Sequence, residues 1–498
     1  MRAGASGARP RPCTGLVLAL GCLAGCAGLP PRPEPVKLPV DAPLAVSTAI
    51  TPATGAGAQR PQGEQAIAVV PGDWPAPSWW KHYEDPVLDR LIDMALKSSP
   101  TLATAHARVD SAEQLVRIAG AAAGAHVDAS GDTSRQRLSD NGLFPPQLLG
   151  FHWYNLSDLG LQVSYTFDWW GKQRDAVESA LDEAHAAEAD RTAAALVLAS
   201  AVADTYFGWQ SDQNRLNLAQ EREAAVVREG RIVAARIRAE LESADEAQRA
   251  DSNIAAVREQ MAELQGSASL RIVALAALVG CAPDQLPAMT VKPLPAISDG
   301  LPEDVKIDLI ARRADLTASR WRVEAARKKR DAARAEFFPD VSINALIGLQ
   351  SVDLGKLLEY RSRVPSATAA IHLPIFDGGR LQAGYRSSQA AIDEAVAGYQ
   401  DTLVGAARDV ATQATSRARI AAQRTQRLIE VAAAERLKFS AEARVRQGVT
   451  DSRMLLAATE SWIEQRDALL QLDSAAVSSD IGLQRALGGG YLRNEKQQ

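Results

Sequence analysis

The chain has 498 residues, of which 46% are apolar, 23% are charged and only 5% are aromatic. Few aromatic residues combined with many alanines favour long helices over a thick globular core. The net charge of -5 and the lack of a basic run exclude a binder that is attracted to nucleic acid by charge.

The N-terminus has the order of a bacterial lipoprotein signal peptide. Arginines precede a short apolar run at 16–20, which cannot span a bilayer, since a transmembrane helix needs roughly 20 apolar residues. The run ends in Leu23–Cys26, which resembles a lipobox. We expect residues 1–25 to be cleaved and Cys26 to carry lipid; the alternative is an ordinary signal peptide with a chance cysteine. Ala27 is not the aspartate associated with inner-membrane retention, so outer-membrane sorting is favoured.

Residues 26–78 are rich in proline, glycine and alanine, which predicts an extended, lipid-anchored arm with no fold of its own. Cys13 and Cys22 would leave with the signal peptide, so Cys281 would be the one free thiol of the mature chain. A single thiol forms no internal disulfide and no metal site, and we expect it to fill a packed turn.

From Trp79 the sequence repeats itself. Leu102 and Arg108 recur 214 residues later as Leu316 and Arg322, and Gly171-Lys172 matches Gly379-Arg380. This order predicts two copies of one unit. The first spans 79–300, with strands at 126–137 and 158–168 and a helical hairpin at 171–280. The second spans 301–491, with strands at 340–350 and 365–374 and a hairpin at 380–488, and 492–498 is a tail.

Each copy places an amphipathic strand pair before its hairpin. Along 159–168, apolar side chains alternate with polar or small ones, and 341–350 does the same. This period of two is typical of a strand with one apolar and one polar face, either in a membrane or in a half-buried soluble sheet. The residues predicted to face water are Gln162, Ser164, Thr166, Ser342 and Asn344.

Two proline-free stretches, roughly 173–239 and 381–447, predict very long helices of about 100 Å. The return helix of the first copy carries apolar residues at spacings of three and four from Ala247 to Leu264. The second copy carries the matching set from Leu455 to Leu472, which Gln465 interrupts. These seams predict that each return helix packs as a coiled coil on the long helix before it.

Four strands per chain cannot close a membrane barrel, which needs about eight or more. Because an open sheet edge cannot face hydrocarbon, strands in a membrane would require several chains to share one barrel.

The chain resembles the TolC- and OprM-like outer-membrane efflux lipoproteins, which include the NodT-like members, over residues 79–491. The resemblance rests on Trp79-Trp80, Asp85-Pro86-x-Leu88, Pro100-x-Leu102, Arg108-Val109, Ser164-Tyr165-x-x-Asp168-x-Trp170-Gly171, Ala332-x-x-Ala335-x-Phe337-Phe338-Pro339, Pro374–Arg380 and Arg485–Gly490. It implies a mainly α chain whose four strands join a 12-stranded trimeric barrel above a helical coiled-coil tunnel. The implied function is a passive exit duct in the outer membrane that docks a periplasmic adaptor and an inner-membrane pump of the RND, major-facilitator or ABC type.

In such a duct the two hairpin tips would form the periplasmic gate. The candidate gate residues are the charged side chains Asp451, Arg453, Arg446, Glu240, Glu242 and Asp245. The candidate adaptor contacts are Gly448, Val449, Leu241 and Ser243. For any one of these residues the alternative is a solvated surface position with no role in gating.

Two positions depart from the pattern of the family. Relatives often have a Leu-Asp-Ala step after the second tip, whereas here Ala457 stands in Leu456-Ala457-Ala458, and Asp451 is the expected substitute. Glu240 stands where relatives usually have glycine, so we expect the first tip to adopt a different local geometry.

Other function classes find less support. The six scattered histidines have no metal-ligand spacing, and no catalytic, phosphate-loop or CxxC pattern occurs, so we expect no enzyme activity and no cofactor beyond the lipid on Cys26. Asp168 and Asp377 are interpreted as caps at strand-to-helix turns. The runner-up function is a periplasmic membrane-fusion adaptor, which would normally show one hairpin, not two.

Overall fold

The computed structural model describes residues 30, 38, 70–71, 74–142, 145–297, 300–301 and 312–492. The predicted signal peptide, Cys26 and most of the predicted arm lie outside these residues. The chain forms two compact units. The sheet unit contains Ser111–Ala184 and Trp321–Val396, and the hairpin unit contains the described residues of Pro39–Asp110, His185–Arg320 and Ala397–Gln498.

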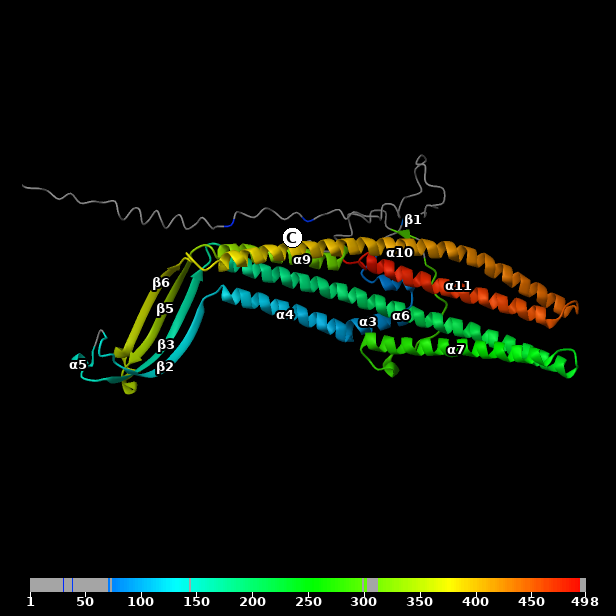
Figure 1. Ribbon diagram of the computed structural model, residues 1–498, viewed down its shortest axis with the longest axis horizontal. Helices are drawn as coiled ribbons and strands as arrows, with labels where there is room; N and C mark the ends of the chain where they lie inside the picture. Colours follow the sequence, from blue (N-terminus) through cyan, green and yellow to red (C-terminus); the bar gives the residue numbers. More distant parts are fainter. Residues whose placement is uncertain are drawn as a thin grey trace, which may run out of the picture. The chain divides into compact units, whose positions relative to one another are not determined.

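The sheet unit is built on four antiparallel strands in the order β2-β3-β5-β6 (Figure 1). The strands are β2 (His126–Arg137), β3 (Trp153–Phe167), β5 (Asp340–Ser351) and β6 (Arg363–His372). The connection from β2 to β3 contains the one-turn helix α5 (Pro146–Leu149). The connection from β5 to β6 contains two short 3-10 helices, η4 (Leu354–Lys356) and η5 (Tyr360–Ser362).

The strand register sorts the side chains onto two chemically different faces. Val163 is opposite Ala345 and Tyr165 is opposite Ile343, so these apolar side chains share one face. Ser164 is opposite Asn344, which places both on the other face. An antiparallel sheet with one apolar and one polar face results, as the alternation predicts.

Strand β3 begins at Trp153, five residues before the predicted strand start at 158. Residues 153–157 pair with the outer half of β2. In this segment Tyr154 and Leu156 lie on the polar face and Asn155 on the apolar face, so the alternation changes phase. The alternation therefore does not predict a strand for residues 153–157, although their pairing with β2 continues. Strand β6 lies two residues earlier than predicted at both ends.

Two long helices run from the sheet unit into the hairpin unit. They are α6 (Lys172–Arg238) and α10 (Arg380–Arg446), each of 67 residues, and their bounds lie within one residue of the predicted ones. The helices α4 (Pro100–Ala122) and α9 (Ala314–Ala335) also belong to both units. Helix α10 begins and ends 208 residues after α6 (172 to 380 and 238 to 446), as expected of a duplicated unit.

The hairpins are completed by α7 (Ala244–Val279) and α11 (Ser452–Ala486) (Figure 1). In α7 the buried residues Ala250, Val257 and Leu264 recur every seven positions and belong to the predicted seam. In α11 the predicted seam is displaced. The buried residues Leu456 and Ile463 each follow a predicted, half-buried seam position by one residue.

The hydrophobic core of the hairpin unit lies where the N-terminal segment meets the helices. The 3-10 helix η2 (Trp79–Tyr83) and α3 (Pro86–Ser98) bury their apolar residues against Tyr206 and Phe207 of α6. A two-residue parallel pair, β1 (Val70–Pro71) with β4 (Gly300–Leu301), and the 3-10 turn η3 (Pro283–Gln285) complete the described elements.

A buried polar cluster joins this core to the second hairpin. The Asp480 carboxylate on α11 accepts hydrogen bonds from the Tyr83 hydroxyl (2.7 Å), His82 Nε2 (3.2 Å) and Arg417 Nη1 (3.2 Å). Burial raises the pKa of Asp480, but these donors outweigh burial and hold it below its ordinary value. A buried carboxylate with three donors keeps its charge and fixes η2 on the hairpin.

Candidate functional site

The two hairpin tips have the same backbone structure. At the first tip the amide of Glu240 donates to the carbonyl of Ile237 and that of Leu241 to the carbonyl of Arg236. At the second tip Gly448 and Val449 repeat the two bonds, to Val445 and Arg444. This pair of bonds is the Schellman motif, which ends a helix through one left-handed residue. Both long helices therefore end in the same way.

The expectation of a different geometry at the first tip is wrong. Glu240 adopts a φ of 57°, close to the 70° of Gly448. Glutamate lacks the freedom of glycine in this region, and the conformation costs about 1 kcal/mol. The terminal hydrogen bonds of α6 impose the turn on a residue that does not favour it.

Four charged side chains connect the two tips. Arg236 at the end of α6 contacts Glu242 (Nε to Oε1, 3.1 Å) and Asp451 (Nη1 to Oδ2, 3.1 Å). Arg453 in the first turn of α11 contacts Glu242 (Nη2 to Oε1, 2.9 Å) and Asp451 (Nε to Oδ2, 3.3 Å). Each arginine thus holds both carboxylates. We call these four residues the tip network.

Asp451 has a second task as the N-cap of α11, because its side chain accepts the backbone N–H of Arg453. Desolvation raises the pKa of Asp451, but hydrogen bonds from Ser452 and Arg453 and the charge of Arg236 outweigh it and lower the pKa overall. The carboxylate is therefore ionised at neutral pH. Its charge is available to join the first tip to the start of the second return helix.

The tip network contains three of the six predicted gate residues, Asp451, Arg453 and Glu242. The other three lie outside it: Arg446 pairs with Glu442 on its own helix (3.6 Å), and Glu240 and Asp245 make no ion pair within the described chain. Arg236 was not among the predicted gate residues. Its repeat partner Arg444 occupies the same helix position, but only the fold shows which of the two arginines meets an acid.

The predicted docking residues form the outer surface of the tips. Leu241 and Val449 are 67% and 71% exposed, and Gly448 and Ser243 are also exposed. Met454, which was not among the predicted docking residues, adds a third exposed apolar side chain. Exposed apolar residues at the end of a charged hairpin are typical of a protein-binding surface.

The predicted water-facing residues share one face of the sheet. Ser164 is opposite Asn344, Thr166 is opposite Ser342, and Gln162 is opposite Leu346. On the same face, Gln350 donates a hydrogen bond to Asp158 (2.6 Å).

At the two strand-to-helix turns, Asp168 accepts a hydrogen bond from the amide of Arg174, and Asp377 accepts hydrogen bonds from those of Gly379 and Leu381, so both aspartates act as caps.

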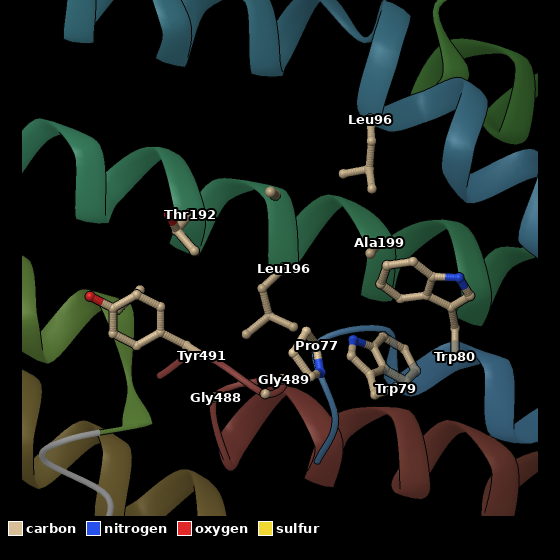
Figure 2. Close-up of a pocket in the computed structure, with 13 residues that line it drawn as sticks. Pro77, Trp79, Trp80, Leu96, Thr192, Leu196, Ala199, Gly488, Gly489 and Tyr491 are labelled. Carbon is tan, nitrogen blue, oxygen red and sulfur yellow. The ribbon is translucent and has the colours of Figure 1, made fainter. Parts of the chain in front are cut away.

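A small cavity of about 190 Å³ lies beside the buried tryptophans of η2 (Figure 2). Leu196 and Gly488–Gly490 line part of it, and none of the described residues in its wall has a charged side chain. A Cβ on Gly488 would lie 1.9 Å from the carbonyl oxygen of Arg312, so only glycine permits this close packing. The cavity is a packing feature where the turn after α11 meets α6.

The sequence matches the family described as "Outer membrane efflux protein" over residues 91–281 and 307–489. It is 32% identical to the multidrug resistance outer membrane protein MdtP of Escherichia coli K12 over 432 residues, which is 85% of this chain and 88% of MdtP. The fold is similar to that of the outer membrane protein VceC of Vibrio cholerae, with a TM-score of 0.75 and 33% identity over 84% of this chain and all of VceC. The Campylobacter jejuni CmeC channel has the same fold, with a TM-score of 0.79, 22% identity and coverage of 94% and 96% of the two chains.

The chain belongs to the outer membrane efflux protein family. It is therefore an outer-membrane channel, with a periplasmic portion, that serves as the exit duct of a tripartite efflux system. The family consists of channels that transport, and the adaptor interpretation is not supported. The mainly helical fold with a membrane β-sheet, inferred from the resemblance, is confirmed by the match to VceC.

Proposed function

We propose that three copies of this efflux channel subunit join their sheets into one closed barrel of 12 strands. The observation that carries this proposal is the four-stranded sheet, whose outer strands β2 and β6 each pair with one neighbour among the described residues. Backbone groups on an open edge cannot remain unpaired in hydrocarbon. Pairing β6 of one chain with β2 of the next satisfies both edges, and threefold symmetry closes the ring.

In this barrel the apolar face, with Leu161, Val163 and Ile347, contacts lipid. The opposite face, with Gln162, Ser164, Thr166, Ser342 and Asn344, lines the water-filled duct. The register supports this assignment because it puts the apolar members of neighbouring strands side by side.

The tip network is the proposed latch of the resting duct. It joins the first hairpin to the second through Arg236, Glu242, Asp451 and Arg453. Opening requires the two hairpins to separate at the tips, so these contacts favour the closed state. Asp451 takes the role that relatives give to the aspartate replaced here by Ala457.

The exposed tip residues Leu241, Ser243, Gly448 and Val449 are the proposed contacts for a periplasmic adaptor, which would link the duct to an inner-membrane pump of the RND, major-facilitator or ABC type. Apolar exposure at the tips supports this docking surface.

The name of MdtP, a multidrug resistance protein, supports drug-like compounds as cargo. We also propose that Cys26 carries the lipid that anchors the mature N-terminus in the outer membrane.

Planar-bilayer conductance of the purified, lipidated protein, with its mass in detergent measured on the same sample, tests the assembly. A species with three times the mass of the chain that inserts and conducts is the expected result. A monomer that does not conduct would refute the shared barrel.

A further inference from the structure

Two ion pairs between α6 and α11 share one antiparallel register above the tips. Arg215 of α6 binds Asp467 of α11 (Nε to Oδ1, 2.7 Å). Seven residues further along α6, Arg222 lies 4.0 Å from Glu460, which is seven residues back along α11, and 3.5 Å from Glu464. Seven residues are two helical turns in a coiled coil, so successive pairs lie on the same seam.

The same step places Glu229 of α6 opposite Arg453 of α11, with the charges exchanged between the helices. These two side chains form no ion pair, because Arg453 is drawn to Glu242 and Asp451 at the tip. Glu229 is half-buried, and the charges that act on it come from Glu460, Arg453 and Glu246. Burial, and then repulsion by Glu460, raise its pKa, while Arg453 lowers it. Glu229 is thus a carboxylate within the field of Arg453 but without its contact.

We propose that Arg453 has two alternative positions: the tip carboxylates hold it while the duct is closed, and Glu229 receives it when the tips separate. This proposal rests on the gate proposed above and adds the partner of the open state. A long, flexible arginine side chain can exchange one carboxylate for another at little net cost when both lie within its reach. Opening would then move Arg453 from one carboxylate to another, and Arg236 would keep its pair with Glu242 of the same hairpin.

The exchange also keeps the hairpins joined. Arg453 belongs to α11, and both Glu242 and Glu229 belong to the first hairpin, so either position connects the two. The upper pairs, Arg215 with Asp467 and Arg222 with Glu460, continue the same seam away from the tip. The tips can therefore part while the upper part of the seam stays closed.

Single-channel recording of the full-length protein in planar bilayers tests the proposal. Glu229→Gln removes the open-state partner and leaves the tip network intact, so the mean open time should fall roughly two- to fivefold, as for a partly exposed ion pair. Glu229→Asp keeps the carboxylate and should restore most of the open time. Glu223→Gln is the matched control, because Glu223 pairs with Arg258 of the same hairpin (2.8 Å) and should leave gating unchanged.

A second comparison separates this inference from the gate itself. Glu242→Gln frees Arg453 from one tip carboxylate and should lengthen openings, and adding Glu229→Gln should reverse that gain. If Glu242→Gln lengthens openings but Glu229→Gln changes neither background, the alternative position is refuted and the gate stands. If Glu242→Gln has no effect, the gate and the inference both fail.

Discussion

Glu240 is a residue in a conformation that its side chain disfavours. It takes the left-handed turn that glycine takes at the second tip, with the same two hydrogen bonds. Glu240→Gly should therefore stabilise the hairpin by about 0.5–1 kcal/mol, since glycine relieves the strain but also gains freedom in the unfolded chain. Chemical denaturation monitored by circular dichroism measures the change.

Gly448→Ala provides the opposite control, because alanine at a φ of 70° should cost about 1 kcal/mol. Equal stability of Glu240→Gly and the wild type would show that other contacts of Glu240 compensate for its backbone.

His82 and Asp480 make the stability of the core dependent on pH. Burial lowers the pKa of His82, but hydrogen bonds to Asp480 and to the Trp79 carbonyl, with the charge of Asp480, raise it overall from 6.5. The stability that His82 adds to the fold is fully present below its unfolded pKa, and it is lost as the pH rises through its folded pKa. That of Asp480, whose pKa is lowered from 3.8, is present above its unfolded pKa and is lost as the pH falls.

Both contributions are therefore present between about pH 4 and pH 6.5. His82→Gln should lower the melting temperature more at about pH 5.5 than at about pH 8.5, because the charged imidazolium is lost as the pH rises through the folded pKa. A difference that does not change between the two pH values would show that the His82–Asp480 contact contributes no charge interaction.

At the scale of elements, the buried positions of α11 differ from the seam that the sequence predicts. Ile463 is 3% exposed, whereas Leu455 of the predicted seam is half-buried. Ile463→Ala should lower the free energy of unfolding by about 2–4 kcal/mol, and Leu455→Ala by roughly half as much, because less apolar surface is lost. Urea unfolding of both variants tests the assignment, and a larger effect at Leu455 would favour the sequence-based seam.

The long helices were predictable almost to the residue because neither contains proline and strand residues precede each of them. The seam of α11 was not, since its predicted and observed positions are both partly apolar and differ by one residue. Which position is buried depends on the neighbouring helices and not on α11 alone. The role of Arg236 was hidden for the same reason, because its acid partner Asp451 is distant in sequence.

At the scale of the whole molecule, the two faces of the sheet should tolerate charge differently. Leu161→Arg places a charge on the proposed lipid face, which costs about 2–4 kcal/mol per chain near the bilayer centre. It should abolish trimer assembly in outer-membrane fractions, whereas the neighbouring Gln162→Arg, on the proposed duct face, should assemble normally and lower only the cation current. Assembly of Leu161→Arg at wild-type levels would reverse the assignment of the faces.

The arms of the two hairpins also constrain how this chain can change in length. The tips meet through Arg236 and Asp451, and both long helices have 67 residues. Seven residues inserted into α10 and α11 alone would carry Asp451 about 10 Å past its partner. Insertions and deletions should therefore be tolerated only as whole heptads made in both hairpins together. Natural length variants would then differ by sets of four heptads, one in each of α6, α7, α10 and α11.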